Sequence, residues 1–136
     1  MITEDYVSFE TAKLLKEKGF DDEYTNAFYD KTGNLYFIDL LSDFSEHPDN
    51  DTDIAAPTLY VAMKWLREKY KLHIITLPYA PFDRHSYHPG FEADMVYIAQ
   101  LFRGIIPIDE VGRSIIKLTH EEACEAAIKY CLENLI

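Results

Sequence analysis

The sequence predicts an α+β fold with two layers, in which three helices cover an antiparallel or mixed sheet of four to five strands. Three capped segments show the helical spacing of apolar residues. Short runs of aromatic and β-branched residues lie between them, as is typical of strands. Turn residues join neighbouring runs as hairpins. The expected order of elements is therefore α-β-β-α-β-β-(β)-α.

The first helix is expected over residues 7–18. Ser8 can cap its N-terminus because a serine oxygen accepts a hydrogen bond from a free backbone N–H of the first turn. Gly19 supplies a left-handed stop, and Phe20 can then fold back on Leu15.

A hairpin is expected next. Its strands are residues 24–29 and 35–40, which are rich in aromatic and β-branched side chains. Residues 30–33 form the turn, and Gly33 can take a positive φ angle there. Residues 41–56 follow as a polar loop.

The second helix is expected over residues 57–70, with Pro57 in its first turn. Trp65 flanks its inner face, which comprises Leu59, Ala62 or Met63, Leu66 and Tyr70. The segments that follow are a strand at 72–77, a long loop at 78–90, a strand at 95–102 and a weaker strand at 113–118.

The last helix begins after Thr119 and runs to the end of the sequence. Thr119 and Glu122 have the spacing of a capping box, in which each side chain bonds a backbone N–H at the other residue. The expected buried face comprises Ala123, Ala127, Ile128, Cys131 and Leu135.

Length and composition indicate one globular domain over residues 1–136. The 24 acidic residues outnumber the 13 basic ones, which gives a formal net charge of −11. General nucleic-acid binding and docking on anionic membranes are disfavoured because both need a surplus of cations. The first residues lack the pattern of a signal peptide, so a cytoplasmic location is expected.

The best candidate metal ligands in the sequence are Asp83, His85 and His88. Two imidazoles and a carboxylate could supply three ligands to zinc. The alternative is that their aromatic loop only packs over the sheet. We expect the alternative, and hence no cofactor, because these three candidates have no thiolate near them in sequence.

His120 and Cys124 have the spacing of half a metalloprotease helix. A second histidine would stand where Cys124 does, and a cysteine can ligate zinc in principle. The alternative is that Cys124 packs as a small hydrophobe. Cys131 lies seven residues further along the same helix, about 10 Å away, which is too far for a disulfide. Both thiols are therefore expected to be reduced and buried.

A basic stripe on the second helix is the main candidate interaction surface. Lys64, Arg67 and Lys71 lie on one face of that helix in an otherwise acidic chain. With Phe82 and Tyr87 of the aromatic loop, they would form a docking surface for an acidic partner. The alternative is a solvated face that reduces repulsion with the acidic loop.

Three parts of the sequence resemble a family of small phage-related and mobile-element proteins of gut anaerobes. They are residues 6–10 with 12–20, residues 56–58 with 64–68, and residues 121–136. The match covers the three helices, somewhat under half of the chain. The resemblance implies an accessory protein of phage or mobile-element origin, and it carries over no catalytic residues.

The sequence therefore predicts a non-catalytic module that binds another protein. The alternative is a small-molecule or metal-binding protein, and even an enzyme, that uses the loop around His85. A third hypothesis is an acidic inhibitor that mimics nucleic acid. A homo-oligomer is compatible with each of them.

Overall fold

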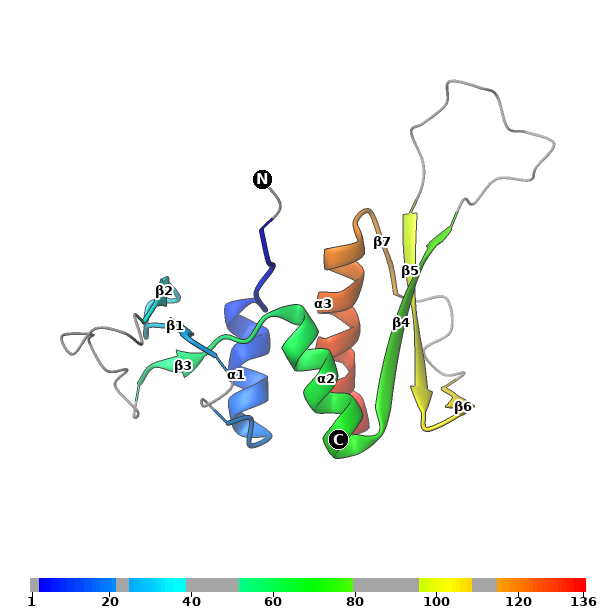
Figure 1. The fold of residues 1–136 in the computed structure, drawn as a ribbon, viewed down its shortest axis with the longest axis horizontal. Coiled ribbons are helices and arrows are strands. Elements are labelled where there is room, and N and C mark those ends of the chain that lie inside the picture. The colour runs from blue at the N-terminus through cyan, green and yellow to red at the C-terminus, as the bar shows by residue number, and fades with distance from the viewer. Residues whose placement is uncertain (1–2, 22–24, 39–51, 80–95, 109–114) are drawn as a thin grey trace, which may run out of the picture.

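The computed structural model describes residues 3–21, 25–38, 52–79, 96–108 and 115–136. In these parts three helices lie between two antiparallel sheets (Figure 1). The helices are α1 (Phe9–Glu17), α2 (Leu59–Tyr70) and α3 (His120–Tyr130), which continues as the π-helical turn Cys131–Leu135. The predicted α+β class is confirmed.

The strands are divided between two sheets, whereas the sequence predicted a single sheet. The first sheet has the order β2-β1-β3, with strands β1 (Ala27–Tyr29), β2 (Leu35–Phe37) and β3 (Ile54–Ala55). The second has the order β4-β5-β6, with β7 also paired to β5; its strands are β4 (Leu72–Tyr79), β5 (Val96–Arg103), β6 (Ile106–Pro107) and β7 (Ile116–Lys117).

Helix α1 has the predicted cap and stop, and its bounds lie within the predicted range 7–18. The Ser8 side chain accepts a hydrogen bond from the backbone N–H of Thr11 at 3.2 Å. Gly19 has φ +89°, and the N–H of Phe20 donates to the carbonyl of Leu15 at 2.9 Å. This is the bond of a Schellman motif, which a glycine in the left-handed conformation allows.

The predicted hairpin forms, with shorter strands. One carboxylate oxygen of Asp30 accepts from the N–H groups of Thr32 and Asn34, and Gly33 has φ +87°. Strand β3 was not predicted, because residues 41–56 were expected to be a loop. Its two residues pair with β1, and a strand so short is defined by that partner and not by its own sequence. Residues 39–51 lie outside the described residues.

Helix α2 ends at the predicted residue but begins differently. Thr58 caps it by accepting from the N–H of Val61 at 3.2 Å, so Pro57 precedes the cap and does not lie in the first turn. A threonine oxygen satisfies a free N–H there, which proline at the same position could not do. At the other end Lys71 has φ +59°, and its carbonyl accepts from the N–H of Gly104 at 2.8 Å.

Strands β4 and β5 form a continuous antiparallel ladder, in which Leu72 pairs with Arg103 and Tyr79 with Val96. Strand β4 extends beyond its predicted end at residue 77, and β5 has the predicted length but is shifted by one residue. Strand β6 was not predicted; it pairs with the end of β5 across a tight turn in which Gly104 has φ +61°. Of the weaker strand predicted at 113–118, residues 116–117 pair with β5 as β7.

Helix α3 starts as predicted, since the Thr119 hydroxyl accepts from the N–H of Glu122 at 3.1 Å. Its last part differs, because residues 131–135 form a π-helical turn. Cys131 and Leu132 are both fully buried, and Leu135 is only half-buried. The extra residue in the turn moves Leu132 into the buried face that a regular helix would give to Leu135.

The hydrophobic core lies between the helices and the inner face of the β4–β5 sheet. It includes Leu15 of α1, Leu66 of α2, Leu101 of β5 and Ile128 of α3. Trp65 is half-buried at its edge, as predicted, with its ring 5.6 Å from that of Phe20. None of the described helices combines the length and apolar character that crossing a membrane requires.

Both cysteines are free and buried in the structure, as predicted. Burial raises the pKa of the Cys131 thiol from 9.0 to about 12. The thiol ionises near pH 9 in the unfolded chain but only near pH 12 in the folded protein. Raising the pH between these values therefore stabilises the unfolded state relative to the folded one. The free energy of unfolding should therefore fall between about pH 9 and 12, by up to about 1.4 kcal/mol per pH unit.

The measurement is urea unfolding across that pH range, with Cys131→Ala as the comparison. The variant removes the titrating group, so its slope against pH should be flatter than that of the wild type. Its stability should be lower than that of the wild type at neutral pH because of the cavity, and the difference should shrink as the pH rises above about 9. Equal slopes in the two proteins, or rapid labelling of Cys131 in the native state, would contradict its placement.

Candidate functional site

The structure describes only part of the set of predicted site residues. Asp83, His85, His88, Phe82 and Tyr87 lie outside the described residues. The structure therefore shows nothing about the predicted metal cluster or the aromatic part of the predicted docking surface.

The three basic residues of the predicted stripe are described. Lys64 is exposed on α2 and lies 3.9 Å from the carboxylate of Glu68. Arg67 is half-buried in the last turn of the helix. Lys71 is the C-cap residue and so lies at the start of β4, next to Arg103 at the end of the paired strand β5. The stripe therefore continues from the helix to the end of the sheet.

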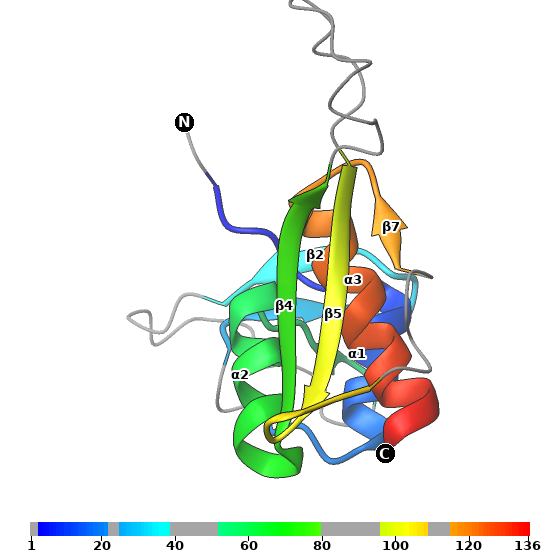
Figure 2. The same cartoon turned by 90° about the vertical axis from the view of Figure 1, so that its right-hand side faces the viewer.

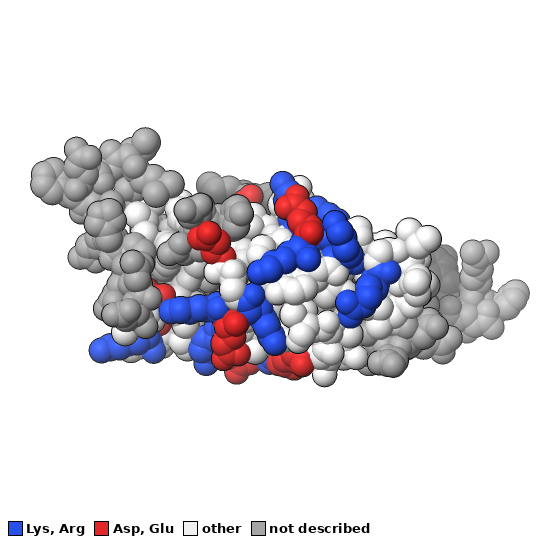
Figure 3. Space-filling view, turned by 90° about the horizontal axis from the view of Figure 1, so that it is seen from below, with Lys and Arg blue, Asp and Glu red and all other residues white. Residues whose placement is uncertain are grey.

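This basic region lies where α2 and β5 end. Basic side chains are favourable at a helix C-terminus, where the helix dipole is negative. Arg67 and Lys69 occupy the last turn of α2, and Lys71 follows them. Figure 3 looks onto this end of the molecule and shows blue Lys and Arg side chains spread over it, with red Asp and Glu side chains between some of them.

An open groove runs along the outer side of α2. It has a volume of about 180 Å³ and is lined by Val61, Lys64, Trp65 and Glu68. These positions are three or four residues apart, so they share one face of the helix. The ammonium of Lys69 lies 5.0 Å from the centre of the Trp65 ring, within the range of a cation–π contact.

The outer face of the β4–β5 sheet is apolar and has no described helix over it. Figure 2 views the sheet from this side, with α2 and α3 behind the two strands. Leu72, Ala99 and Leu101 are buried against the helices, so the alternate residues point away from them. These outward-facing residues were not predicted from the sequence as site residues.

The outward residues form rows across neighbouring strands. Leu77, Ile98 and Ile116 pair in one row, and Ile75 lies beside it. The side chains of Ile75, Leu77 and Ile116 are 45%, 41% and 42% exposed. Strands β4 and β5 have apolar residues on both faces, interrupted by His73, Thr76 and Gln100, and this pattern was the available signal in the sequence. We call Ile75, Leu77, Ile98 and Ile116 the outer apolar face.

The described strands of this sheet contain no aspartate or glutamate, whereas Arg103 ends β5 and Lys117 ends β7. Both lie on the side of the sheet that faces the helices, since Arg103 donates to the carbonyl of Leu135 at 3.2 Å and Lys117 pairs with the inward residue Tyr97. Strand β4 also lies at an edge of the sheet, since β5 is the strand that pairs with it among the described residues. Exposed apolar faces and open strand edges are features that often mark contact sites on proteins.

A second cluster joins α3 to β4. The Nε2 atom of His120 lies 3.6 Å from the Sγ atom of Cys124, and its Nδ1 atom lies 2.7 Å from the hydroxyl oxygen of Thr76. The rings of Tyr97 and His120 meet edge to face, 6.0 Å apart. Burial raises the pKa of Cys124, so its thiol keeps the proton and is not an activated nucleophile.

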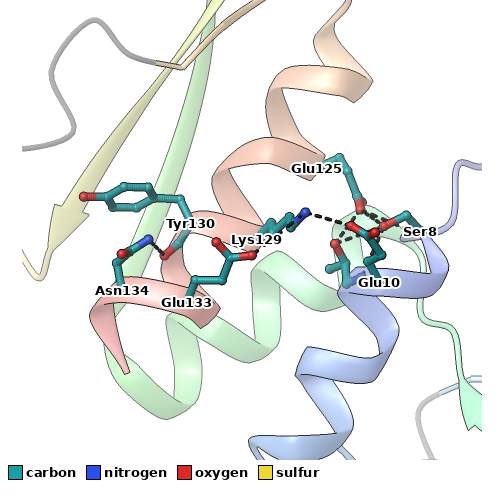
Figure 4. A network of polar contacts seen from close by, with 8 residues as sticks. Ser8, Glu10, Glu125, Lys129, Tyr130, Glu133 and Asn134 are labelled. Carbon is teal, nitrogen blue, oxygen red and sulfur yellow. Dashed lines mark hydrogen bonds and ion pairs between the residues drawn. The ribbon is translucent and has the colours of Figure 1, made fainter.

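A third cluster joins α3 to the start of α1 (Figure 4). One carboxylate oxygen of Glu125 accepts hydrogen bonds from the backbone N–H and hydroxyl of Ser8 and from the hydroxyl of Thr11. Beside it the ammonium of Lys129 lies 2.8 Å from the carboxylate of Glu10. Burial, followed by the charge of Glu125, raises the pKa of the Tyr29 phenol. The cluster ties two helices together.

Within the described ranges, no group of three or more histidine, cysteine, aspartate and glutamate side chains converges as a full metal-ligand set. The candidate sites in the described part of the chain are the outer apolar face, the groove on α2 and the pair of His120 and Cys124. Comparisons with protein-family models, with curated proteins and with solved structures found no match.

Proposed function

We propose that this protein is a non-catalytic interaction module that binds an acidic protein partner through the outer apolar face. The observation that carries the proposal is the row of Leu77, Ile98 and Ile116, which lies on the side of the sheet away from the helices. Apolar patches of this kind on soluble proteins often mark contact sites.

The charge distribution favours an acidic partner. The chain as a whole carries a net charge of −11, yet the charged residues in and directly beside the described strands of this sheet are Lys71, Arg103 and Lys117. Complementary charge at the rim of an interface accelerates association and suppresses wrong partners. A basic partner would bind the acidic parts of the chain instead.

The resemblance to phage-related and mobile-element proteins agrees with an accessory role. A protein of that origin would bind a protein of its host or of the element itself. The metal-binding alternative around His85 and the hypothesis of a nucleic-acid mimic stay predictions. Half of the acidic residues, with Arg84 and Arg113 among the basic ones, lie outside the described residues.

The test is affinity capture from host lysate with the Ile75→Glu, Leu77→Glu double variant beside the wild type. Two negative charges on the outer apolar face should weaken binding of the captured acidic partner by tenfold or more, because they interrupt the apolar contact and repel the partner. The matched control is Leu35→Glu, whose side chain is 37% exposed in the other sheet and should leave binding unchanged. Raised salt should also weaken binding, because the rim contacts are ionic.

The captured protein is then purified and titrated against all three forms. Equal affinity for the wild type and the double variant would overturn the proposal. So would a partner with a basic contact surface. If sedimentation shows a dimer of this chain that the double variant abolishes and no second protein binds, the face joins two copies, and the proposed acidic partner is wrong.

A further inference from the structure

His120 and Cys124 occupy successive turns at the start of α3. His120 is the first residue of the helix and is exposed, whereas Cys124 is 1% exposed and points into the protein. A separation of four residues brings both side chains to one face of the helix. The imidazole therefore lies between solvent and the sulfur atom.

The spacing of the two donor atoms suits a shared metal ion. Zinc binds cysteine sulfur at about 2.3 Å and histidine nitrogen at about 2.0–2.1 Å, usually with tetrahedral angles. Those values place the sulfur and nitrogen about 3.5 Å apart. The observed distance between Sγ of Cys124 and Nε2 of His120 is 3.6 Å. The observed separation therefore matches the one that a shared zinc ion would impose.

Thr76 holds the ring in the orientation that ligation needs. Its hydroxyl oxygen is 2.7 Å from Nδ1 of His120 and faces α3 from the inner side of β4. With the ring proton on Nδ1, the imidazole donates to Thr76 and its Nε2 lone pair is directed toward Cys124. Metal-binding histidines characteristically donate their second ring N–H to an oxygen in this way.

We propose that His120 and Cys124 form a binding site for a thiophilic divalent cation such as Zn²⁺, independent of the proposed docking function. Binding breaks the S–H bond of Cys124, releases the proton to solvent and forms a metal–sulfur bond. Nε2 of His120 is the second protein ligand. Water or small exogenous ligands fill the remaining positions on the exposed side of the imidazole.

The test is titration of the purified, reduced chain with Co²⁺ as a spectroscopic substitute for Zn²⁺. One equivalent should produce the near-ultraviolet charge-transfer band of a cobalt–thiolate bond, and Zn²⁺ should then abolish it. His120→Gln, a change at an exposed residue, should weaken binding at least tenfold. Cys124→Ser should remove the band, and Thr76→Val should weaken binding because the ring loses its acceptor.

Two matched controls separate this site from others. Cys131→Ala removes the second buried thiol, and His73→Gln removes a histidine of β4; both should keep the band and the affinity. No band in the wild type would overturn the proposal. So would a band that persists in Cys124→Ser, or binding that survives His120→Gln and is lost in a His85→Ala, His88→Ala double variant.

Discussion

Replacing Leu132 with alanine is expected to lower the free energy of unfolding by about 3–4 kcal/mol. Leu132 is fully buried in the π-helical turn that ends α3, and it belongs to the core shared by the helices and the β4–β5 sheet. Truncating a buried leucine removes its burial and leaves a cavity, and both effects destabilise the folded state.

The matched control is Leu135→Ala in the same π-helical turn. Leu135 is half-buried, so its truncation should cost about 1 kcal/mol or less. Urea unfolding followed by circular dichroism measures both values. If Leu135→Ala proves the more costly change, the helix ends regularly and the π-helical turn is wrong, because a regular helix places residue 135 on the buried stripe.

Local signals predicted most of the helices. Ser8 and Thr119 cap the predicted helices because capping needs only a side-chain oxygen and a backbone N–H three residues away. Gly19 ends α1 for an equally local reason, its positive φ angle. Such features involve residues close in sequence, and the sequence therefore contains the information that defines them.

Features that depend on distant partners were not predicted. Strands β3 and β6 have two residues each and exist through pairing with β1 and β5. The division into two sheets depends on which face each hairpin presents to the helices. The π-helical turn follows from how Leu132 packs in the core, and helical spacing alone assigned that position to Leu135.

The same distinction applies to the sites. The spacing of His120 and Cys124 indicated a shared face, but the sequence offered no reason to connect Thr76 with them. Their hydrogen bond joins residues 44 positions apart. The outer apolar face depends equally on strand register, since a shift of one residue would exchange the inward and outward sets.

The second large effect is expected at Glu125, which lies 117 residues from Ser8. Its carboxylate accepts hydrogen bonds from Ser8 and from Thr11, whose side chain is fully buried. Glu125→Ala should cost about 2–3 kcal/mol. The buried Thr11 hydroxyl loses its bond to a charged acceptor, worth about 1.5–3 kcal/mol, and keeps only its contact with the Ser8 hydroxyl at 3.1 Å. The N-terminus of α1 also loses a favourable negative charge.

Two further variants test that reason, with unfolding in urea as the measurement. Glu133→Ala removes an exposed carboxylate from the same part of the chain and should cost well under 1 kcal/mol. In a Thr11→Val background there is no Thr11 hydroxyl to lose its carboxylate acceptor. Glu125→Ala should therefore cost less there by about 1 kcal/mol. Simple additivity of Thr11→Val and Glu125→Ala would show that the carboxylate does not act through Thr11. In that case the whole effect would come from the helix dipole and from Ser8. The loss of stability should then be smaller than the expected value of about 2–3 kcal/mol.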